Sequence, residues 1–450
     1  MNKKLSALTL VTASALALGA CSSGAASSPS ATESTAAAGP QNITLWLAGG
    51  DTPDALRDYL KTTYKANNGG TLTIEEQAWP DLVTKLTTAL PDANNTPDVV
   101  EVGNTQSPTF TNVGAFSDIS DMYAELGGDK LLQSFVEVGK VDGKNYTLPY
   151  YFGSRYMFYR KDVYSAAGVS VPKTLEEFNA TVKTIASKNP KDIKNFSGFF
   201  LGGQDWRNGI SWVFANGGEL AKNEGGQWTS TLSDPNTIKG LTQLQGIFAD
   251  ASKAPKTAKD QSPWLYINDS DVIKDDADNP KKVTGKTSLA AATIMAPGWA
   301  HWSIGDLKND KRVWNDGKFG VFVLPGNDGK PAPVFAGGSN IGISAKSKNQ
   351  AGSRDLMKII FSPEYQQMLG KNGLGPANSD YVSSLGTDQF AKALIESASN
   401  SKLTPAAPGW ATVETSGKLE ELFAKIAEGG DVTALAKEYD ALLTPMLNGK

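Results

Sequence analysis

The order of strand-like and helix-like segments near the start of the chain constrains the fold most. Residues 43–47 (ITLWL) predict a β-strand ending at Ala48-Gly49-Gly50, and a helix is expected from about Pro53 to Asn67. Residues 71–75 (TLTIE) predict a second strand, and Trp79-Pro80-Asp81 opens a second helix. The apolar residues of that helix have i, i+3, i+4 spacing: Leu82, Val83, Leu86 and Leu90. Strands that alternate with helices in this way predict parallel βαβ units and an α/β fold.

The same alternation continues along the rest of the chain. Strands are expected at Val99–Val102 and Arg155–Arg160, and Thr174 and Glu177 have the spacing of a helix capping box. Two later strands are predicted at Gly320–Leu324 and Asn340–Ser344, and two long helices close the chain. Apolar stripes mark these helices, one with Leu419, Leu422, Phe423 and Ile426, the other with Leu435, Tyr439, Leu442 and Leu443.

The N-terminus predicts export and a membrane anchor. Lys3 and Lys4 precede an apolar stretch, Leu5–Leu18, which is too short to span a bilayer and is typical of a secretory signal. Leu18-Gly19-Ala20-Cys21 resembles the bacterial lipobox, which implies that residues 1–20 are removed and that Cys21 carries lipid. An ordinary secretory signal that happens to end near a cysteine is the alternative. Residues 21–41 would then be the lipidated cysteine and a flexible tether, because Ser, Ala, Thr, Gly and Pro bury little apolar surface.

Composition excludes several classes of function. About 409 residues follow the tether, which is enough for two lobes with separate cores. The net charge of −4, with both signs scattered, argues against a nucleic-acid partner. One His and one Cys provide no set of soft-metal ligands, so no metal and no cofactor are expected. The 10 Trp and 13 Tyr often stand beside Gly, Pro or Asn, which predicts aromatic side chains on loops.

About ten short motifs occur in the order of a known family. They are Thr96-Pro-Asp-Val-Val100, Gly114–Ile119, Asp142-Gly-Lys-Asn-Tyr-Thr-Leu-Pro149, Tyr159–Asp162, Ala167-Gly168, Pro172–Phe178, Asn216-Gly-Gly218, Ala291–Trp299, Val321–Pro325, Gly337–Ser344 and Ser362-Pro-Glu364 with Gln366. With them the chain resembles the extracellular solute-binding proteins of ABC importers, in the large carbohydrate-binding group that includes maltose-binding protein. Leu175 replaces the Trp usual in that pattern, which is a change in packing.

The resemblance implies an α/β fold of two doubly wound lobes joined by a multi-segment hinge, the type II periplasmic-binding-protein arrangement. The chain would cross between lobes near Tyr150–Arg155 and Phe322–Gly326. The N-terminal lobe would then contain residues 42–150 plus 326–384, and the C-terminal lobe residues 151–325 plus 385–450. The resemblance also implies a monomeric binding protein, not an enzyme, at the extracellular face of the cell membrane. Its partners would be an oligosaccharide and the permease subunits of an ABC transporter.

A sugar site needs aromatic faces for apolar C–H surfaces and planar polar groups for hydroxyls. Ligands of open α/β sheets bind beyond the carboxyl ends of the strands. The candidates are aromatic and polar residues expected at strand ends, on the hinge and on cleft loops: Asp51, Trp79, Asn104, Thr105, Gln106, Tyr151, Ser154, Arg155, Trp206, Arg207, Asn208, Trp264, Trp299, Gly337, Gly338, Ser339, Asn340 and Trp410. Several Trp faces predict two or more sugar rings. The many amide and hydroxyl groups predict a neutral or N-acetylated sugar, not a uronate.

Each aromatic candidate has a packing alternative. Trp299 follows Pro-Gly and matches the stacking Trp of the family, so we expect it to contact sugar, whereas Trp46 and Trp212 lie in periodic segments and are expected in the core. Stacking and core packing both stay open for three others, Trp206, Trp264 and Trp410.

The charged candidates have alternatives too. Arg155 could donate to a sugar hydroxyl or form a salt bridge in the hinge, and Asp51 could simply cap the helix near Pro53. His301 is expected to be a structural neighbour of the site. A group of aspartates lacks EF-hand spacing and is expected to be a solvated loop, not a calcium site: Asp269, Asp271, Asp275, Asp276 and Asp278.

A secreted, membrane-anchored glycoside hydrolase is the rival class, because it would also have a cleft rich in aromatic residues. Hydrolysis needs two carboxylates across the scissile bond, one of them with a raised pKa. No pair of acidic residues stands in a motif that singles it out, and the chain has no G-x-S-x-G nucleophile elbow.

Overall fold

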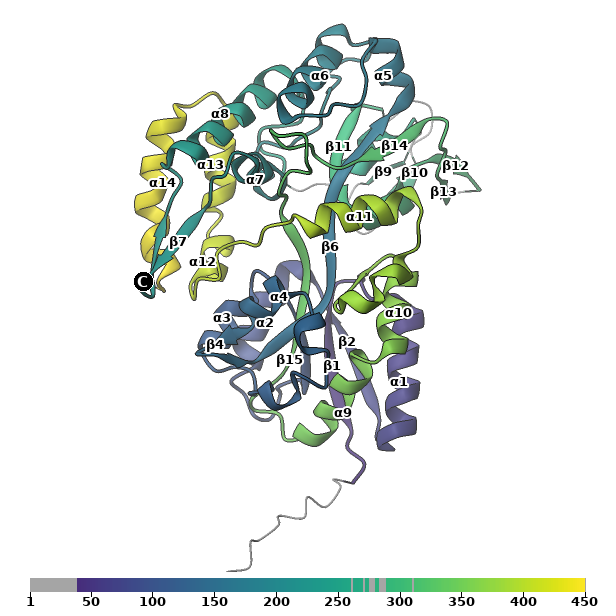
Figure 1. Cartoon of the computed structure of the whole chain (residues 1–450), viewed down its shortest axis with the longest axis vertical. Helices are drawn as coiled ribbons and strands as arrows, with labels where there is room; N and C mark the ends of the chain where they lie inside the picture. The colour runs from purple at the N-terminus through teal and green to yellow at the C-terminus, as the bar shows by residue number, and fades with distance from the viewer. Residues whose placement is uncertain are drawn as a thin grey trace, which may run out of the picture. The chain divides into compact units, whose positions relative to one another are not determined.

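A computed structural model describes residues 39–259, 262–269, 272–274, 280–282, 289–309 and 311–449. Residues from Gly39 onward form one compact unit, to which the following description applies (Figure 1). The expected signal, Cys21 and most of the tether lie outside the described residues. None of the helices described here combines the length and the apolar character needed to cross a membrane.

The first part of the chain forms the predicted βαβ units. Its elements are β1 (Ile43–Ala48), α1 (Asp54–Asn68), β2 (Leu72–Gln77), α2 (Trp79–Ala89), β3 (Val99–Gly103), α3 (Ser107–Asn112), η1 (Ser120–Met122), η2 (Gly128–Lys130), α4 (Gln133–Val138), β4 (Lys140–Val141) and β5 (Lys144–Asn145). Strand β1 pairs in parallel with both β2 and β3, as the alternation predicts. Helix α1 begins one residue later than expected, with Pro53 as its N-cap.

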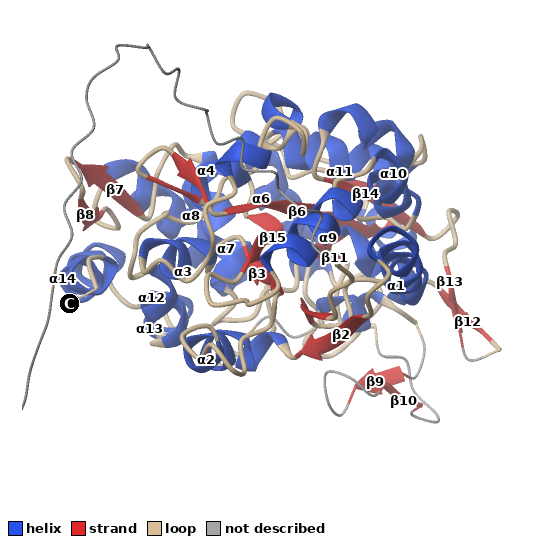
Figure 2. Cartoon of the chain, turned by 90° about the horizontal axis from the view of Figure 1, so that it is seen from below, coloured by secondary structure: helices blue, strands red, loops and turns tan. Residues whose placement is uncertain are grey.

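Helices cover both faces of this sheet, as the view in Figure 2 shows. On one face, Leu45 of β1 packs with α1 through Leu56 and Leu60. On the other face, Val100 of β3 packs with Leu82 of α2 and with neighbouring apolar residues of α2 and α3. Two buried faces explain why β1 and β3 read as apolar runs.

The compact unit has two halves with separate cores, a first half whose core contains Leu45 and Leu56 and a second half whose core contains Trp212 and Leu422. Strand β6 (Thr147–Arg160) is 14 residues long and contributes to both cores. Its first part pairs with β15 (Ala336–Ile343) and β16 (Gly375–Pro376). Its last part pairs with β11 (Thr293–Pro297) and β14 (Phe319–Phe322). Strand β15 also pairs with β3, so that in the described residues one eight-stranded sheet has the order β11-β6-β15-β3-β1-β2, with β14 and β16 beside β6.

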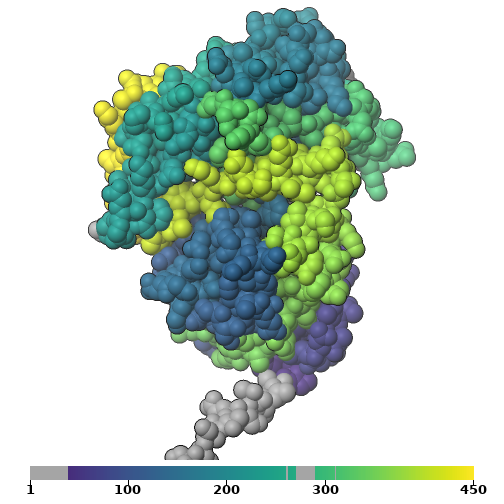
Figure 3. All heavy atoms as spheres, viewed as in Figure 1, coloured from purple at the N-terminus to yellow at the C-terminus, as the bar shows by residue number. Residues whose placement is uncertain are grey.

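The remaining elements surround these strands. They are α5 (Lys161–Ala167), α6 (Leu175–Lys188), α7 (Trp206–Ala215), β7 (Ala221–Glu224), β8 (Gln227–Ser230), α8 (Pro235–Asp250), η3 (Pro263–Ile267), β9 (Val272–Lys274), β10 (Pro280–Lys282), η4 (Gly298–Ser303), β12 (Asp306–Lys308), β13 (Lys311–Val313), α9 (Gln350–Ile360), α10 (Pro363–Lys371), η5 (Ser379–Leu385), α11 (Gln389–Ser399), α12 (Trp410–Thr415), α13 (Lys418–Ala427) and α14 (Val432–Leu447). Helix α11 packs on β6, and its atoms cross the face of the molecule seen in Figure 3.

Several local predictions are confirmed. Thr174 is the N-cap of α6 and its hydroxyl accepts a hydrogen bond from the amide of Glu177 at 3.1 Å. Trp212 lies in the core of the second half, and its indole donates to Asn179. Trp46, which was expected in the core, is instead only partly buried: it packs against the α2 face of the sheet, and its indole donates to Glu75.

Residues after Phe322–Gly326, the segment predicted for the second passage between the halves, still contact the second half. The amide of Leu175 in α6 donates to the carbonyl of Gly326, and Asn327 donates to the carbonyl of Ala215 in α7. Val334 still packs in the core of the second half, and β15 begins only at Ala336. We therefore propose that this crossing lies between Val334 and Ala336. The other lobe limits stay predictions.

Candidate functional site

The pairing of β6 brings the ends of several strands close to the middle of β6, where its partners change. Strand β11 runs antiparallel to β6, and its last residue, Pro297, lies opposite Arg155. Helix η4 therefore begins where β6 changes from one set of partners to the other. On the other side of this level, Ser339 of β15 lies between Gly103, the last residue of β3, and Tyr151 of β6. The ends of β3 and β11 thus both reach the region where the two halves of the compact unit meet.

Asp51 connects two aromatic candidates. Its Oδ2 accepts hydrogen bonds from Trp79 Nε1 and from the Tyr151 hydroxyl, each at 3.0 Å. Burial raises the pKa of Asp51, and the hydrogen bonds from Trp79 and Tyr151 oppose this rise. No side chain of the described residues caps α1, so the alternative of Asp51 as a helix cap does not describe this geometry. Asp51 instead fixes the positions of an indole and a phenol.

The Trp79 ring lies directly against the ends of β1 and β3. A Cβ atom at Gly49 would come within 2.7 Å of Trp79 Cδ1, and one at Gly103 would come within 3.3 Å of Cζ3. Gly49 also has a φ of +56°, which favours glycine. The two glycines therefore make room for the indole at the carboxyl edge of the sheet.

Glu101 is a residue of this site that the sequence interpretation missed. It lies in β3 with 0% exposure, and its Oε2 accepts a hydrogen bond from the amide of Ala48 at 2.9 Å. The pKa of Glu101 is raised to about 8, chiefly by burial, and the charge of Asp51 contributes to the rise. A carboxylate inside the apolar run VVEV was the available signal, because a buried acid needs a specific environment.

A second polar group joins elements from the two halves. The Thr105 hydroxyl, which follows β3, donates to Glu414 of α12 at 3.1 Å, and Arg207 Nη2 of α7 lies 3.4 Å from the same carboxylate. Thr109 of α3 donates to the carbonyl of Pro408 at 3.0 Å. Burial raises the pKa of Glu414, and Arg207 opposes this rise. The segment after β3 is thereby attached to α12.

Arg155 and Asn208 also come together. Arg155 Nη1 donates to Asn208 Oδ1 at 3.1 Å, and the guanidinium lies 5.8 Å from the centre of the Phe335 ring. Both Arg155 and Asn208 are buried. Sequence reasoning placed Trp206, Arg207 and Asn208 on a loop, but they form the first turn of α7, which Asp205 caps by accepting from the amide of Asn208.

The tryptophans separate clearly by exposure. Trp206 and Trp410 are each 1% exposed and pack edge to face at 6.2 Å, and Trp206 Nε1 donates to Glu420. Core packing, one of the two open alternatives, describes both residues, and Trp410 begins helix α12 instead of lying on the expected loop. Trp264 is 8% exposed in η3 and contacts Trp299 edge to face at 4.8 Å. Trp299 keeps 42% of its surface exposed.

The remaining polar candidates mostly stabilise the strands. Asn104 Nδ2 donates to the carbonyl of Ala336 at 2.9 Å, and Asn340 Nδ2 donates to the carbonyl of Phe135 at 2.8 Å. Asn104, Ser339 and Asn340 are all buried. Gln106 is half-buried beside Gly103, and its Oε1 has no hydrogen bond to any described residue.

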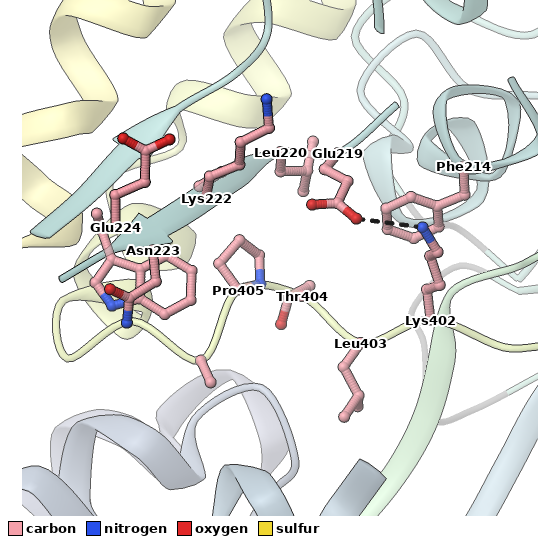
Figure 4. A pocket seen from close by; sticks show the side chains of 13 residues that line it. Phe214, Glu219, Leu220, Lys222, Asn223, Glu224, Lys402, Leu403, Thr404 and Pro405 are labelled. Atoms are coloured by element: carbon pink, nitrogen blue, oxygen red, sulfur yellow. Dashed lines mark hydrogen bonds and ion pairs between the residues drawn. The ribbon is translucent and has the colours of Figure 1, made fainter. Parts of the chain in front are cut away.

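A pocket of about 440 Å³ shares no lining residue with these candidates. It is enclosed by the β7–β8 hairpin and residues 402–406, with Phe214 and Trp228 among its lining (Figure 4). Lys402 points toward Glu219 across it, at 3.4 Å between Nζ and Oε1. The sequence interpretation singled out none of its lining residues.

The aspartate group falls only partly within the described chain. Asp269 lies 2.7 Å from Arg160 Nη1 and 2.8 Å from Lys318 Nζ, so cations already neutralise it. The other four, Asp271, Asp275, Asp276 and Asp278, lie outside the described residues. Across the part of the chain that the structure describes, no three His, Cys, Asp or Glu residues are grouped so as to hold a metal ion.

Similar proteins place this chain in context. Residues 60–395 match the family model for bacterial extracellular solute-binding proteins. The diacetylchitobiose binding protein DasA of Streptomyces coelicolor is 31% identical over 377 residues, which are 83% of this chain and 82% of that protein. The solved structure of the sugar-binding protein MalE from Xanthomonas citri has a TM-score of 0.73 at 19% identity, over 90% of this chain and 97% of that one. The GacH receptor of Streptomyces glaucescens has a TM-score of 0.70 at 18% identity, over 90% and 98%. These structural neighbours confirm the predicted two-lobed α/β fold.

The burial of Glu101 predicts a pH-dependent stability. The pKa of an unfolded Glu is near 4.3, and the pKa of folded Glu101 is about 8. The folded state therefore holds more protons between these values, so the free energy of unfolding should fall as pH rises from 5 to 8. Chemical denaturation at each pH should show a smaller fall for Glu101→Gln, because the amide does not ionise. Glu176→Gln changes an exposed carboxylate and is the control; an equal fall in wild type and Glu101→Gln would contradict the prediction.

Proposed function

Because the chain belongs to the bacterial extracellular solute-binding protein family, we propose that it captures an oligosaccharide outside the cell membrane and delivers it to the permease of an ABC transporter. The observation that carries the proposal is the position of Trp299. Its half-exposed ring stands at the end of β11, at the level where the two halves meet, and Trp264 supports its edge. An exposed indole fixed in this way is a stacking face for a sugar ring.

The ligand is a neutral or N-acetylated oligosaccharide of two or more rings. The relative DasA is named for binding diacetylchitobiose, which supports this class. The charges of the site support it too, because the Arg207 guanidinium is already paired with Glu414 and Asp51 would repel the carboxylate of a uronate. Diacetylchitobiose is therefore the first probe to test.

The proposed contacts come from both sides of the junction. Trp299 stacks on one ring, and Trp79, which Asp51 holds together with the buried Tyr151, provides a second aromatic surface at the ends of β1 and β3. Gln106 and Arg207 provide polar groups for sugar hydroxyls. Trp206, Trp264 and Trp410 act indirectly, since their packing positions α7, η3 and α12.

Ligand capture would couple to movement of the two halves about β6. A ligand shifts such an equilibrium only by the difference between its affinities for the closed and open forms. Contacts that the sugar makes with both halves at once supply that difference. The hydrogen bond from Thr105 to Glu414 already joins the two halves in this structure, and we propose that the closed form keeps it.

The hydrolase alternative receives no support from the relatives, which are named as binding proteins. Asp51 holds two aromatic side chains, and Glu101 is fully buried, so neither is placed like an acid and a base on opposite sides of a scissile bond. We propose binding without turnover.

The family name places the protein outside the cytoplasm, and we propose that lipid on Cys21 holds it at the membrane surface. Stable anchoring by acyl chains needs more than one chain, so the modification would carry at least two.

Replacing Trp299 tests the site. Stacking in a desolvated cleft contributes about 1–3 kcal/mol, by analogy with aromatic–base contacts, so Trp299→Ala should weaken diacetylchitobiose binding by about one to two powers of ten. Calorimetry measures this, and thermal melts should change little because the ring is half-exposed. Trp206→Ala is the matched comparison: its buried ring should cost about 3–5 kcal/mol of stability. Intact affinity together with a collapsed melting temperature in Trp299→Ala would place that ring in the core.

Binding without turnover has its own test. Chromatography of diacetylchitobiose after incubation with the protein should show no product, and a hydrolysis product would favour the glycoside hydrolase.

Replacing Cys21 tests the anchor. Cys21→Ala should release the protein from the cell surface into the medium, with sugar affinity nearly unchanged, because the cysteine precedes the tether. Immunoblots of cell and medium fractions measure the distribution. Retention of the variant on cells would show that something other than lipid on Cys21 holds the protein.

A further inference from the structure

Helix η4 presents a second tryptophan beyond Trp299. In a 3₁₀-helix side chains at positions i and i+3 eclipse one another, because each turn contains three residues. Trp299 and Trp302 have this spacing within η4, which spans Gly298–Ser303. Along an ideal 3₁₀-helix this spacing corresponds to about 6 Å at roughly 2 Å of rise per residue, so both tryptophans start from the same side of η4.

Trp302 is exposed, yet its position is supported. Its ring is 68% exposed, the most of any tryptophan among the exposed large apolar residues of the described chain. It lies 4.1 Å from the His301 ring, which in turn stacks on Phe390 of α11 at 4.4 Å with an angle of 19° between planes. His301 Nδ1 is 2.7 Å from the carbonyl of Gly298, which ties the imidazole to the start of η4.

The His301 ring separates the rings of Trp302 and Phe390 and packs against both. Burial lowers the pKa of His301, so the ring is neutral at neutral pH and can pack between two aromatic rings without a charge. The edge of Trp314 in turn contacts Phe390 at 4.7 Å. Trp302 thus stands at the open end of a row of rings that reaches into the core. A large apolar side chain held rigidly in solvent loses little entropy when a ligand covers it.

We propose that Trp302 stacks on a further ring of the bound oligosaccharide, so that η4 offers two successive aromatic faces and the protein prefers chains longer than a disaccharide. This inference rests on the proposed function of Trp299. What it adds is the length of the ligand. Trp299 would bind the sugar ring nearest the junction of the two halves, and Trp302 would bind the next ring outward.

Continuity with Trp299 favours sugar over a protein partner at Trp302. The ring belongs to the same short helix as the proposed first face, and its support runs through residues of η4 and α11. One observation favours a permease contact instead. Lys308 and Lys311 of the neighbouring β12–β13 hairpin are exposed, and a neutral sugar does not need these charges. Transport measurements separate these partners.

The test is calorimetry with diacetylchitobiose and the corresponding N-acetylated tri- and tetrasaccharides. Wild type should bind the longer chains about tenfold more tightly than the disaccharide. Trp302→Ala should remove that advantage and leave disaccharide affinity within about twofold, whereas Trp302→Phe should retain most of it because a ring remains. Val113→Ala, at a residue 75% exposed after α3, is the control and should match wild type. Thermal melts of each variant should agree with wild type, as expected for an exposed side chain.

The possible outcomes are distinct. Failure of wild type to bind any of the three sugars would overturn the proposed function and this inference together. Binding of the disaccharide with no gain for longer chains, or equal affinities in wild type and Trp302→Ala, would overturn this inference alone. An equal loss of affinity for the di-, tri- and tetrasaccharide in Trp302→Ala would also overturn it, because Trp302 would then contact the same ring as Trp299. Unchanged binding with reduced uptake by cells would assign the ring to the permease.

Discussion

The ladder hydrogen bonds of β6 set the geometry on which the site depends. One half of the strand pairs with β15 and β16 and the other half with β11 and β14, so a single backbone belongs to the cores of both halves. Because β11 is antiparallel to β6 and ends opposite Arg155, η4 can only begin at the junction. Because β15 aligns Tyr151 with Gly103, the loops after β1 and β3 reach the same level. The aromatic surfaces are consequences of this register.

Buried acids give the junction its chemical character. Glu101 is held among β1 and β3 by the amide of Ala48, and burial raises its pKa, so near neutral pH it is largely uncharged. Asp51 is used to orient Trp79 and Tyr151, and Glu414 joins Thr105 to Arg207. These acids already have protein partners, which leaves the indole faces of Trp79 and Trp299 and the amide of Gln106 for a ligand. Such a surface suits a sugar without charge.

Hydrophobic periodicity and the positions of Gly, Pro and capping residues predicted most of the elements, and the capping box at Thr174 was confirmed. Exposure was harder to predict. Trp206 and Trp410 stand beside polar or Gly-Pro residues, which indicates loops, but each begins a helix whose packing buries the ring. Asn104 and Asn340 were expected to face a ligand, yet they donate to backbone carbonyls of distant segments, which no local pattern reveals. The prediction that Trp299 contacts sugar came from a family motif. The role proposed for Trp302 could not be predicted in this way, because it rests on its position in helix η4 of the structure.

The most direct test of the account is a crystal structure of the protein with diacetylchitobiose bound. We predict a sugar ring stacked on Trp299, with further contacts to Trp79, so that residues of both halves touch one ligand. The contrary result would be a sugar bound elsewhere, for example in the cavity between the β7–β8 hairpin and residues 402–406, with the Trp299 face left open.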